Sequence, residues 1–271
     1  MDSPWRQYLE ILEGSEPIES GTHPTARNNS NFLKSHSGER DSFPNWFFPA
    51  YKFLFDQEIP EEPSSEQKAY TEFKLLKEQD NIGIAMPCPI FQEDNFIESE
   101  FIPGETLRSE IENNTDDISE ILRQLGSMIQ NLHESGYARW DNRTSNIIVD
   151  RTGWEEGPTP YLIDNEYIIP DATKADQELD LVSFIDSINS EEPYKFNELY
   201  SGFREGYGNI PTNSIALAGL RTFSEEILNQ NFDKAYNSLK NTISGIQENN
   251  TKSDYSQEKQ YKRFRANPSK E

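Results

Sequence analysis

The sequence has 271 residues, and its hydrophobic fraction of 34% suffices for one large domain or for two lobes with cores of their own. Its 48 acidic residues outnumber 25 basic ones, and the net charge of −23 disfavours nucleic acid as a stand-alone partner. No apolar run reaches the roughly 18 residues of a membrane helix. Because the chain opens without a signal-peptide pattern and Cys88 is its single cysteine, we expect a cytoplasmic protein.

Three features open the chain. The letters WRQYLEIL predict a short amphipathic helix within residues 1–14. A stretch full of turn residues then leads to the short apolar flank NFLKS, which contains Lys34. An aromatic segment interrupted by prolines follows at 43–55, and we interpret it as packing between lobes rather than as a platform for stacking bases.

The next elements are a helix and two strands. Apolar residues recur at helical spacing over 66–79, with Ser64 or Ser65 as the cap. The segments IGIAMPCPIF (82–91) and NFIESEFI (95–102) are each predicted to form a strand. The second also alternates apolar and polar residues, as a strand with one buried face does.

The clearest helix of the sequence lies at 117–136. It has one broad apolar face, and Gly136 is well placed to end it. Two predicted strands follow, NIIV (146–149) and PYLID (160–164), joined by a turn-rich segment. Beyond residue 175 the pattern is mostly helical. His133, within the long helix, is interpreted as a packing residue rather than a catalyst.

This order of elements predicts an α+β protein with two lobes. A β-rich N-lobe covers 1–103, and a Pro-Gly pair marks the junction. A mainly helical C-lobe with one β-hairpin covers 104–247. The polar residues 248–271 predict a flexible tail, whose end is locally basic.

Three oxygen-bearing side chains suggest the chemistry. Asp141 and Asn146 have the D-x-x-x-x-N spacing of the kinase catalytic loop, and Asp164 ends the strand YLID. Phosphoryl transfer from ATP needs a carboxylate at the acceptor hydroxyl and oxygen ligands for Mg²⁺. The long helix, the loop, the hairpin and the terminal aspartate also come in the order found in kinases, which is more specific than any one motif.

The stretch LHESGYARWDNRTSNIIVD, followed by YLIDNEY, resembles the protein-kinase-like superfamily. Within it, DNRTSN is similar to the D-x-T-T-S-N loop of the KEOPS-associated archaeal kinase, a small relative of the RIO kinases. FIESEFIPGETLRSEI is similar to the hinge passage of these atypical kinases, and QELDLVSFI to the helix after their metal site. The likeness covers roughly 14–210, and lipopolysaccharide-core kinases are the second choice.

The resemblance implies a role for each residue of the loop. Asp141 would orient or deprotonate the acceptor hydroxyl. Arg143 stands where conventional protein kinases have a lysine and would contact the γ-phosphate, although an ion pair with the acidic surface is an equal alternative. Asn146 and Asp164 would hold Mg²⁺ on the phosphates of ATP.

The resemblance also implies a nucleotide site in the N-lobe. Glu100, Phe101 and Ile102 would form the hinge whose backbone pairs with adenine. Glu72 would be the carboxylate of helix C that anchors the phosphate-binding lysine.

Two lysines compete for that position. Lys34 follows Gly14 by 20 residues, in an arrangement similar to the short acidic loop of the small archaeal kinase. Lys52, in AYKFLF, has the A-x-K pattern of a usual β3 lysine. We favour Lys34, and the absence of G-x-G-x-x-G from the first 60 residues excludes a conventional glycine loop.

The sequence departs from the family pattern at two places. The family's His-Gly-Asp is Arg-Trp-Asp at 139–141, which removes a supporting hydrogen bond but no metal ligand. Its Asp-Phe-Gly is Asp-Asn-Glu at 164–166, which removes a flexible glycine hinge. No Ala-Pro-Glu segment follows, as in atypical kinases.

We therefore expect an ATP- and Mg²⁺-dependent kinase that phosphorylates a hydroxyl, first as a RIO-like serine/threonine protein kinase. The alternatives are a sugar or lipopolysaccharide-type kinase of small molecules, and a pseudokinase that acts as a scaffold. The acceptor hydroxyl is thus expected on a protein or on a small molecule. A protein that forms a complex with the kinase is a further expected kind of partner. The acidic composition indicates a surface suited to high salt or, second, a face for a basic partner. Contact with nucleic acid is expected only through the basic end of the tail.

Overall fold

The computed structural model describes most residues between 63 and 247 and three shorter stretches before them. The described ranges are 16–18, 25–27, 31–36, 63–153, 157–229, 231 and 233–247. The helix expected at 1–14, the aromatic segment at 43–55 with Lys52, and the tail at 248–271 lie outside these ranges. Among the described helices, none combines the length and the apolar composition that crossing a bilayer requires.

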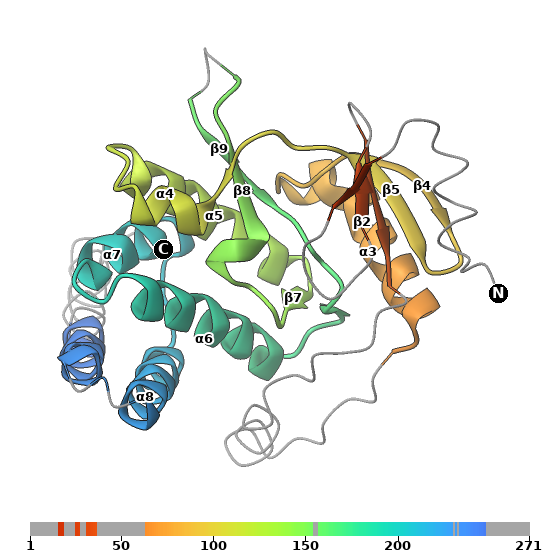
Figure 1. Ribbon diagram of the computed structural model, residues 1–271. Coiled ribbons are helices and arrows are strands. Elements are labelled where there is room, and N and C mark those ends of the chain that lie inside the picture. Colours follow the sequence, from red (N-terminus) through yellow and green to blue (C-terminus); the bar gives the residue numbers. More distant parts are fainter. Residues whose placement is uncertain are drawn as a thin grey trace, which may run out of the picture.

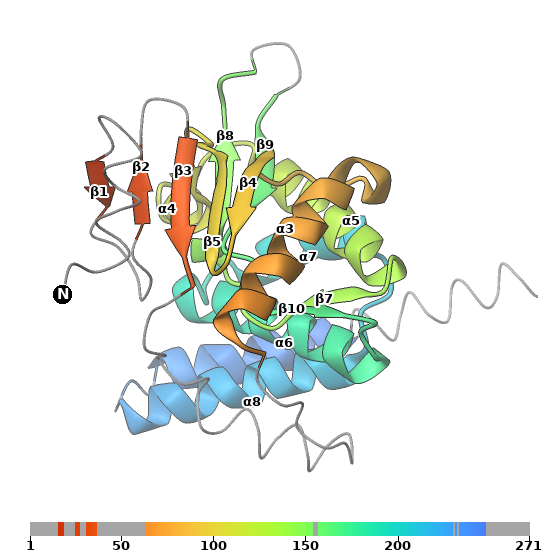
Figure 2. The same ribbon diagram turned by 90° about the vertical axis from the view of Figure 1, so that its right-hand side faces the viewer.

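Five short strands form an antiparallel sheet in the first part of the chain. In spatial order they are β1 (Glu16–Ile18), β2 (Thr25–Arg27), β3 (Asn31–Ser35), β5 (Phe96–Glu100) and β4 (Pro89–Glu93). The strand predicted over 95–102 is confirmed, whereas the one predicted over 82–91 begins only at Pro89. Figure 2 shows helix α3 (Ser65–Ile82), in orange, beside this sheet.

The segment between α3 and β4 is held by the Gln79 side chain and by two isolated backbone hydrogen bonds, from the N–H of Leu162 to Ala85 and from the N–H of Glu100 to Cys88, both at 2.9 Å. Gln79 Oε1 accepts the backbone N–H of Met86 at 2.9 Å, and Gln79 Nε2 donates to the carbonyl of Pro87 at 3.4 Å. Pro87 and Pro89 have no N–H to donate. The apolar run is therefore partly buried, and its strand begins only at the second proline, Pro89, which pairs with Ser99.

Helix α3 begins with a capping box. The Ser64 hydroxyl accepts the N–H of Gln67 at 3.2 Å, and Gln67 Oε1 accepts the N–H of Ser64 at 2.8 Å. Ser64 is thus the cap of the two serines considered, and Gly83 ends the helix with φ +75°. The buried face of α3 includes Glu72, which is only 5% exposed. A carboxylate so deeply buried needs partners.

The second part of the chain is mainly helical (Figure 1), with a three-stranded sheet in the order β6-β8-β9 and the pair β10-β7 between its helices. Its elements are β6 (Glu105–Thr106), α4 (Leu107–Glu112), α5 (Ile118–Glu134), β7 (Tyr137–Arg139), the 3-10 turn η1 (Thr144–Asn146), β8 (Ile147–Asp150), β9 (Thr159–Leu162), β10 (Ile168–Pro170), α6 (Lys174–Glu191), α7 (Phe196–Tyr207) and α8 (Thr212–Leu228). A further helix covers 233–247. The two-lobed α+β arrangement and the helical content beyond residue 175 are confirmed.

Helix α5 contributes a long row of residues to the hydrophobic core, which continues from α3 to α8. Its predicted apolar face is confirmed, since Ile121, Leu125 and Leu132 are fully buried, and the helix ends just before Gly136. Helix α7 packs closely on α5, because Gly126 presents no side chain at the crossing. A Cβ on Gly126 would lie 2.1 Å from the carbonyl oxygen of Phe203.

The predicted hairpin is also confirmed. Strands β8 and β9 pair antiparallel, with Ile147 opposite Leu162. Beyond this pair, the N–H of Ile163 donates to the carbonyl of Asn146 at 3.0 Å. Asn146 and Asp164 consequently lie at the same end of the hairpin.

Candidate active site

The loop between β7 and β8 ties Asp141 and Asn146 together. Asn146 Nδ2 donates to the backbone carbonyl of Asp141 at 2.9 Å and to its Oδ2 at 3.0 Å. The amide nitrogen is thereby committed to Asp141, which leaves the amide oxygen facing away. That oxygen accepts a hydrogen bond of 3.4 Å from the Ser145 hydroxyl and has capacity for a further ligand.

Arg143 holds the other carboxylate oxygen of Asp141. Its Nε lies 2.7 Å from Asp141 Oδ1, with the two side chains 45% and 28% exposed. Asp141 is therefore fixed from both sides, by Arg143 and by Asn146. An ion pair is one of the two roles expected for Arg143. Because it uses Nε for Asp141, its terminal N–H groups can still contact a phosphate.

Asp164 directly follows β9, in a left-handed conformation with φ +54°. Asp and Asn tolerate this region better than most residues. Its side chain is 40% exposed, so it can reach a ligand while the preceding Ile163 remains tied to Asn146. Asp164 and Asn146 thus supply one carboxylate and one amide oxygen at one end of the hairpin.

Lys34, on strand β3, meets two carboxylates. Its ammonium lies 3.3 Å from Glu72 Oε2 and also contacts Asp164 Oδ1. Burial alone would lower the pKa of Lys34, but the negative charges of Asp164 and Glu72 outweigh it and raise the pKa above its ordinary value. Lys34 is therefore charged, and it bridges the sheet, helix α3 and the end of the hairpin. Its competitor Lys52 lies outside the described residues.

Glu72 receives three partners at its buried carboxylate. Beside Lys34, its Oε2 lies 3.0 Å from Nε2 of His36, and its Oε1 accepts the N–H of Asn165 at 3.0 Å. Burial would raise the pKa of Glu72, but Lys34 and His36 outweigh it and hold the pKa well below its ordinary value. Helix α3 is thus connected to the residue that follows Asp164.

His36 and Glu166 belong to this cluster although the sequence did not indicate either. The His36 ring is fully buried, and its Nδ1 lies 3.9 Å from Glu166 Oε2. Burial and the charge of Lys34 lower the pKa of His36, so it is neutral at pH 7. Glu166 is the third residue of the Asp-Asn-Glu stretch, where the resemblance implied a glycine. The two-residue spacing from Lys34 to His36 was the available signal, because alternate strand residues share a face.

A second buried cluster, formed by His133, Arg139 and Asp180, holds the start of the loop between β7 and β8. Asp180 Oδ2 accepts the backbone N–H of Arg139 at 2.8 Å and lies 2.9 Å from His133 Nε2. The buried Arg139 donates from Nη2 to the carbonyl of Ile163 at 2.6 Å. Arg139 thus supplies a hydrogen bond to the residue before Asp164. His133 itself is buried, and its Nδ1 lies 2.9 Å from the Tyr207 hydroxyl.

The predicted hinge begins at Glu100, the last residue of β5, and leads toward β6. Glu100 is exposed, and its backbone N–H already donates to the carbonyl of Cys88 at 2.9 Å. Phe101 is half-buried and Ile102 is buried. Pairing with adenine would therefore fall to backbone groups other than the N–H of Glu100.

The donor set suits Mg²⁺ better than a metal held by protein alone. Within the described ranges no three His, Cys, Asp or Glu side chains are grouped as metal ligands. Asp164 and the amide oxygen of Asn146 match what Mg²⁺ usually takes from a protein, namely one or two ligands beside phosphates and waters. Asp164 would have to share its carboxylate with Lys34.

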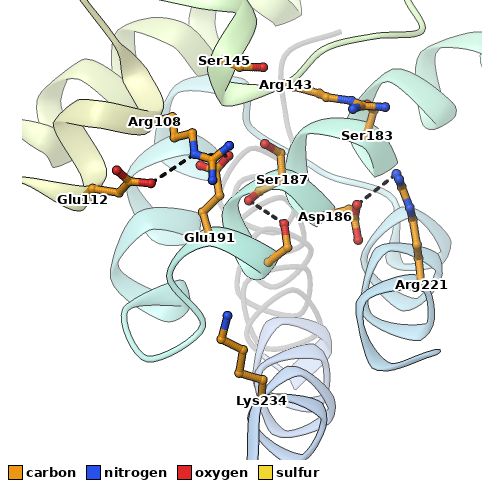
Figure 3. A pocket seen from close by; sticks show the side chains of 11 residues that line it. Arg108, Glu112, Arg143, Ser145, Ser183, Asp186, Ser187, Glu191, Arg221 and Lys234 are labelled. Atoms are coloured by element: carbon orange, nitrogen blue, oxygen red, sulfur yellow. Dashed lines mark hydrogen bonds and ion pairs between the residues drawn. The ribbon is translucent and has the colours of Figure 1, made fainter. Parts of the chain in front are cut away.

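A cavity of about 400 Å³ adjoins the same loop (Figure 3). Arg143 and Ser145 line it from the loop side. Helix α6 forms a wall that includes Glu191, and Lys234 approaches from the helix at 233–247. Asp141, the residue predicted to orient the acceptor hydroxyl, does not line this cavity but forms an ion pair with the lining residue Arg143.

Three solved structures resemble the chain in fold. WaaP, in complex with acyl carrier protein, is 15% identical with a TM-score of 0.51, and the match covers 88% of this chain and 98% of that chain. Rio2 kinase from Chaetomium thermophilum, in an ADP/Mg²⁺-phosphoaspartate complex, is 14% identical with a TM-score of 0.51, covering 89% and 75%. ADP-bound aminoglycoside phosphotransferase APH(2'')-Ib is 12% identical with a TM-score of 0.52, covering 91% and 97%. No protein-family model and no curated protein matches the sequence. The chain therefore adopts the two-lobed, protein-kinase-like fold that Rio2 kinase and aminoglycoside phosphotransferases share.

Proposed function

We propose that this protein is a Mg²⁺- and ATP-dependent phosphotransferase that moves the γ-phosphoryl group to a hydroxyl. The observation that carries the proposal is the buried ammonium of Lys34, which contacts Glu72 and Asp164 together. A lysine oriented by one carboxylate and lying beside a second, more exposed one suits the binding of ATP phosphates next to a metal ion.

In this proposal the nucleotide lies between the two parts of the chain. Lys34 binds the phosphates, and Glu72 orients its ammonium. Asp164 and the amide oxygen of Asn146 hold Mg²⁺, which neutralises phosphate charge when bound. The segment Glu100–Ile102 contacts adenine through its backbone.

Asp141 acts on the acceptor. It orients the hydroxyl and takes its proton as the hydroxyl oxygen bonds to the γ-phosphorus and the bond to the β,γ-bridging oxygen breaks. Arg143 contacts the γ-phosphate through its remaining N–H groups. Because Arg143 and Asn146 already hold Asp141 on both oxygens, this carboxylate is oriented before any ligand arrives.

Two classes of acceptor follow from different observations. The resemblance of DNRTSN to RIO-type loops favours a serine or threonine hydroxyl of a protein. The cavity beside Arg143 and Ser145 favours the second candidate, a kinase of small molecules. ATP turnover is common to both and is the first property to measure.

The test compares two aspartates that share a positive φ. Asp164 and Asp171 have φ +54° and +53°, and Asn tolerates this region. We expect Mg²⁺-dependent ATP hydrolysis or autophosphorylation in the wild type and in Asp171→Asn, and a loss of at least about 100-fold in Asp164→Asn. ATP that binds without turnover in all three proteins would indicate a pseudokinase. Equal ATP binding with and without Mg²⁺, unchanged by Asp164→Asn, would contradict the metal site.

A further inference from the structure

The cavity beside the catalytic loop is built rigidly onto that loop. The N–H of Thr144 donates to the Ser187 hydroxyl at 3.1 Å, and the two hydroxyls lie 2.9 Å apart. The Thr144 hydroxyl also donates a hydrogen bond of 2.6 Å to Glu191 Oε2. Ser187 and Glu191 line the cavity from helix α6. Whatever binds there is consequently held at a fixed position relative to Asp141, whose carboxylate pairs with the lining residue Arg143.

The lining is entirely polar. Four serines and seven charged side chains surround a volume of about 400 Å³, and no apolar side chain is among them. Pockets for drug-like molecules of about 300–1,000 Å³ are mostly apolar. A cavity of this size whose walls offer hydroxyls, carboxylates and cations instead matches a small molecule with many hydroxyl groups.

The charged side chains of the lining indicate which charge a ligand would carry. Four cations face three carboxylates, and the fourth cation, Arg143, is compensated by Asp141 just outside the lining. Two cations are compensated within the wall: Arg221 pairs with Asp186 at 2.9 Å, and Arg108 pairs with Glu112 at 3.1 Å. Lys234 has no ion-pair partner in the described part of the chain, and Figure 3 shows its side chain pointing toward the cavity.

We propose that this cavity is the acceptor site and that its ligand is a small polyhydroxylated molecule bearing a phosphate or carboxylate, which Lys234 binds. This inference rests on the proposed phosphotransferase function and names the acceptor class for it. The hydroxyls of the ligand contact the serine-rich wall of α6. One hydroxyl extends past Arg143 to Asp141, and the anionic group remains at the opposite wall. A polycationic acceptor does not fit, because the unpaired cation repels it.

Four probes on one sugar scaffold test the charge: glucose 6-phosphate, glucuronate, glucose and glucosamine. Binding is measured by titration calorimetry on Asp164→Asn, so that no phosphoryl transfer is required. We expect glucose 6-phosphate or glucuronate to bind at least about tenfold more tightly than glucose, and glucosamine to bind most weakly. The first two probes separate a phosphate ligand from a carboxylate ligand.

Matched lysines on one helix test the assignment. Lys234→Gln is expected to remove the tenfold preference, whereas Lys240→Gln, which changes an exposed lysine of the same helix that does not line the cavity, leaves it intact. Equal binding of all four probes, no binding of either anionic probe at millimolar concentration, or an unchanged preference in Lys234→Gln overturns the proposal. If inorganic phosphate binds as tightly as glucose 6-phosphate, the claim that the ligand is polyhydroxylated is refuted.

The two proposals fail in different ways. Anion-selective binding without any ATP turnover in the wild type would leave the cavity as a ligand site and refute the phosphotransferase. ATP turnover without anion selectivity would refute the acceptor class alone.

Discussion

The ammonium of Lys34 lies 3.3 Å from Oε2 of Glu72 and so joins strand β3 to helix α3 across 38 residues of sequence. The same ammonium reaches Asp164 on the other part of the protein. These contacts link the sheet, the helix and the hairpin through a single charge. The cluster is therefore both a structural connection and the proposed phosphate site.

Replacing this charge separates the two roles. Lys34→Met is expected to lower kcat/KM for ATP turnover by at least about 100-fold, because an electrostatic contact with the transferring phosphates is lost. The variant is also expected to unfold at lower denaturant concentration, since Glu72 loses a buried partner. Lys74→Met, which changes an exposed lysine of α3, should alter neither. Wild-type turnover in Lys34→Met would refute its role.

Asp141 is expected to matter for transfer and not for nucleotide binding. In the proposed arrangement it contacts the acceptor hydroxyl, so Asp141→Asn should reduce kcat by about 10²- to 10⁴-fold. The dissociation constant of ATP should stay within about twofold of wild type, as measured by calorimetry. Asp116→Asn, at an exposed position, serves as the control. A variant that keeps kcat but binds ATP poorly would assign Asp141 to the nucleotide instead.

His36 predicts a pH dependence of stability. Burial and the charge of Lys34 lower its pKa from the ordinary value of 6.5. Below about pH 6.5 the unfolded chain therefore binds a proton that the folded protein resists, so the free energy of unfolding falls as pH decreases. The slope from this group is at most about 1.4 kcal/mol per pH unit. Its effect should precede that of Glu72, whose lowered pKa matters only below its ordinary value of 4.5.

The measurement compares urea unfolding of the wild type and His36→Gln between pH 7.5 and 5, where glutamine keeps a hydrogen-bond donor but does not titrate. We expect the two stability curves to diverge as pH falls, with the wild type losing more. His133 is present in both proteins and cancels. Curves that remain parallel would show that protonation of His36 is not coupled to folding.

The crossing of α5 and α7 predicts a large effect from one methyl group. A Cβ on Gly126 would lie 2.1 Å from the carbonyl oxygen of Phe203 and 2.7 Å from the N of Tyr207. Gly126→Ala is therefore expected to lower the free energy of unfolding by about 1–3 kcal/mol, since the helices must separate. Gly153→Ala, at an exposed glycine with no neighbour within 4 Å, should change it by less than about 0.5 kcal/mol. Equal stability of the two variants would mean that the helices adjust freely.

Several elements were predictable because their causes lie within a few residues of sequence. The apolar spacing of α5, the Ser64 cap of α3 and the alternation of β5 are local patterns, and all three are found in the structure. The order of helix, loop and hairpin led in the same way to the kinase-like fold. The strand expected over 82–91 was wrong up to Cys88, because Ile82 still belongs to α3, Gly83 caps that helix, and the Gln79 side chain bonds the backbone of Met86 and Pro87.

The sequence alone determined which residue types were available: an acid and an amide five positions apart, a further aspartate after a strand, and two lysines near the start. Only the tertiary structure decided which of them meet. Lys34 and Asp164 are 130 residues apart, and the His36–Glu166 contact and the polar cavity likewise combine distant segments. Contacts of this kind arise where the sheet and α3 meet the end of the hairpin and where α6 packs against the loop at Thr144, and no local pattern encodes such packing. Backbone periodicity repeats along the chain, whereas the position of a buried charge depends on every element around it.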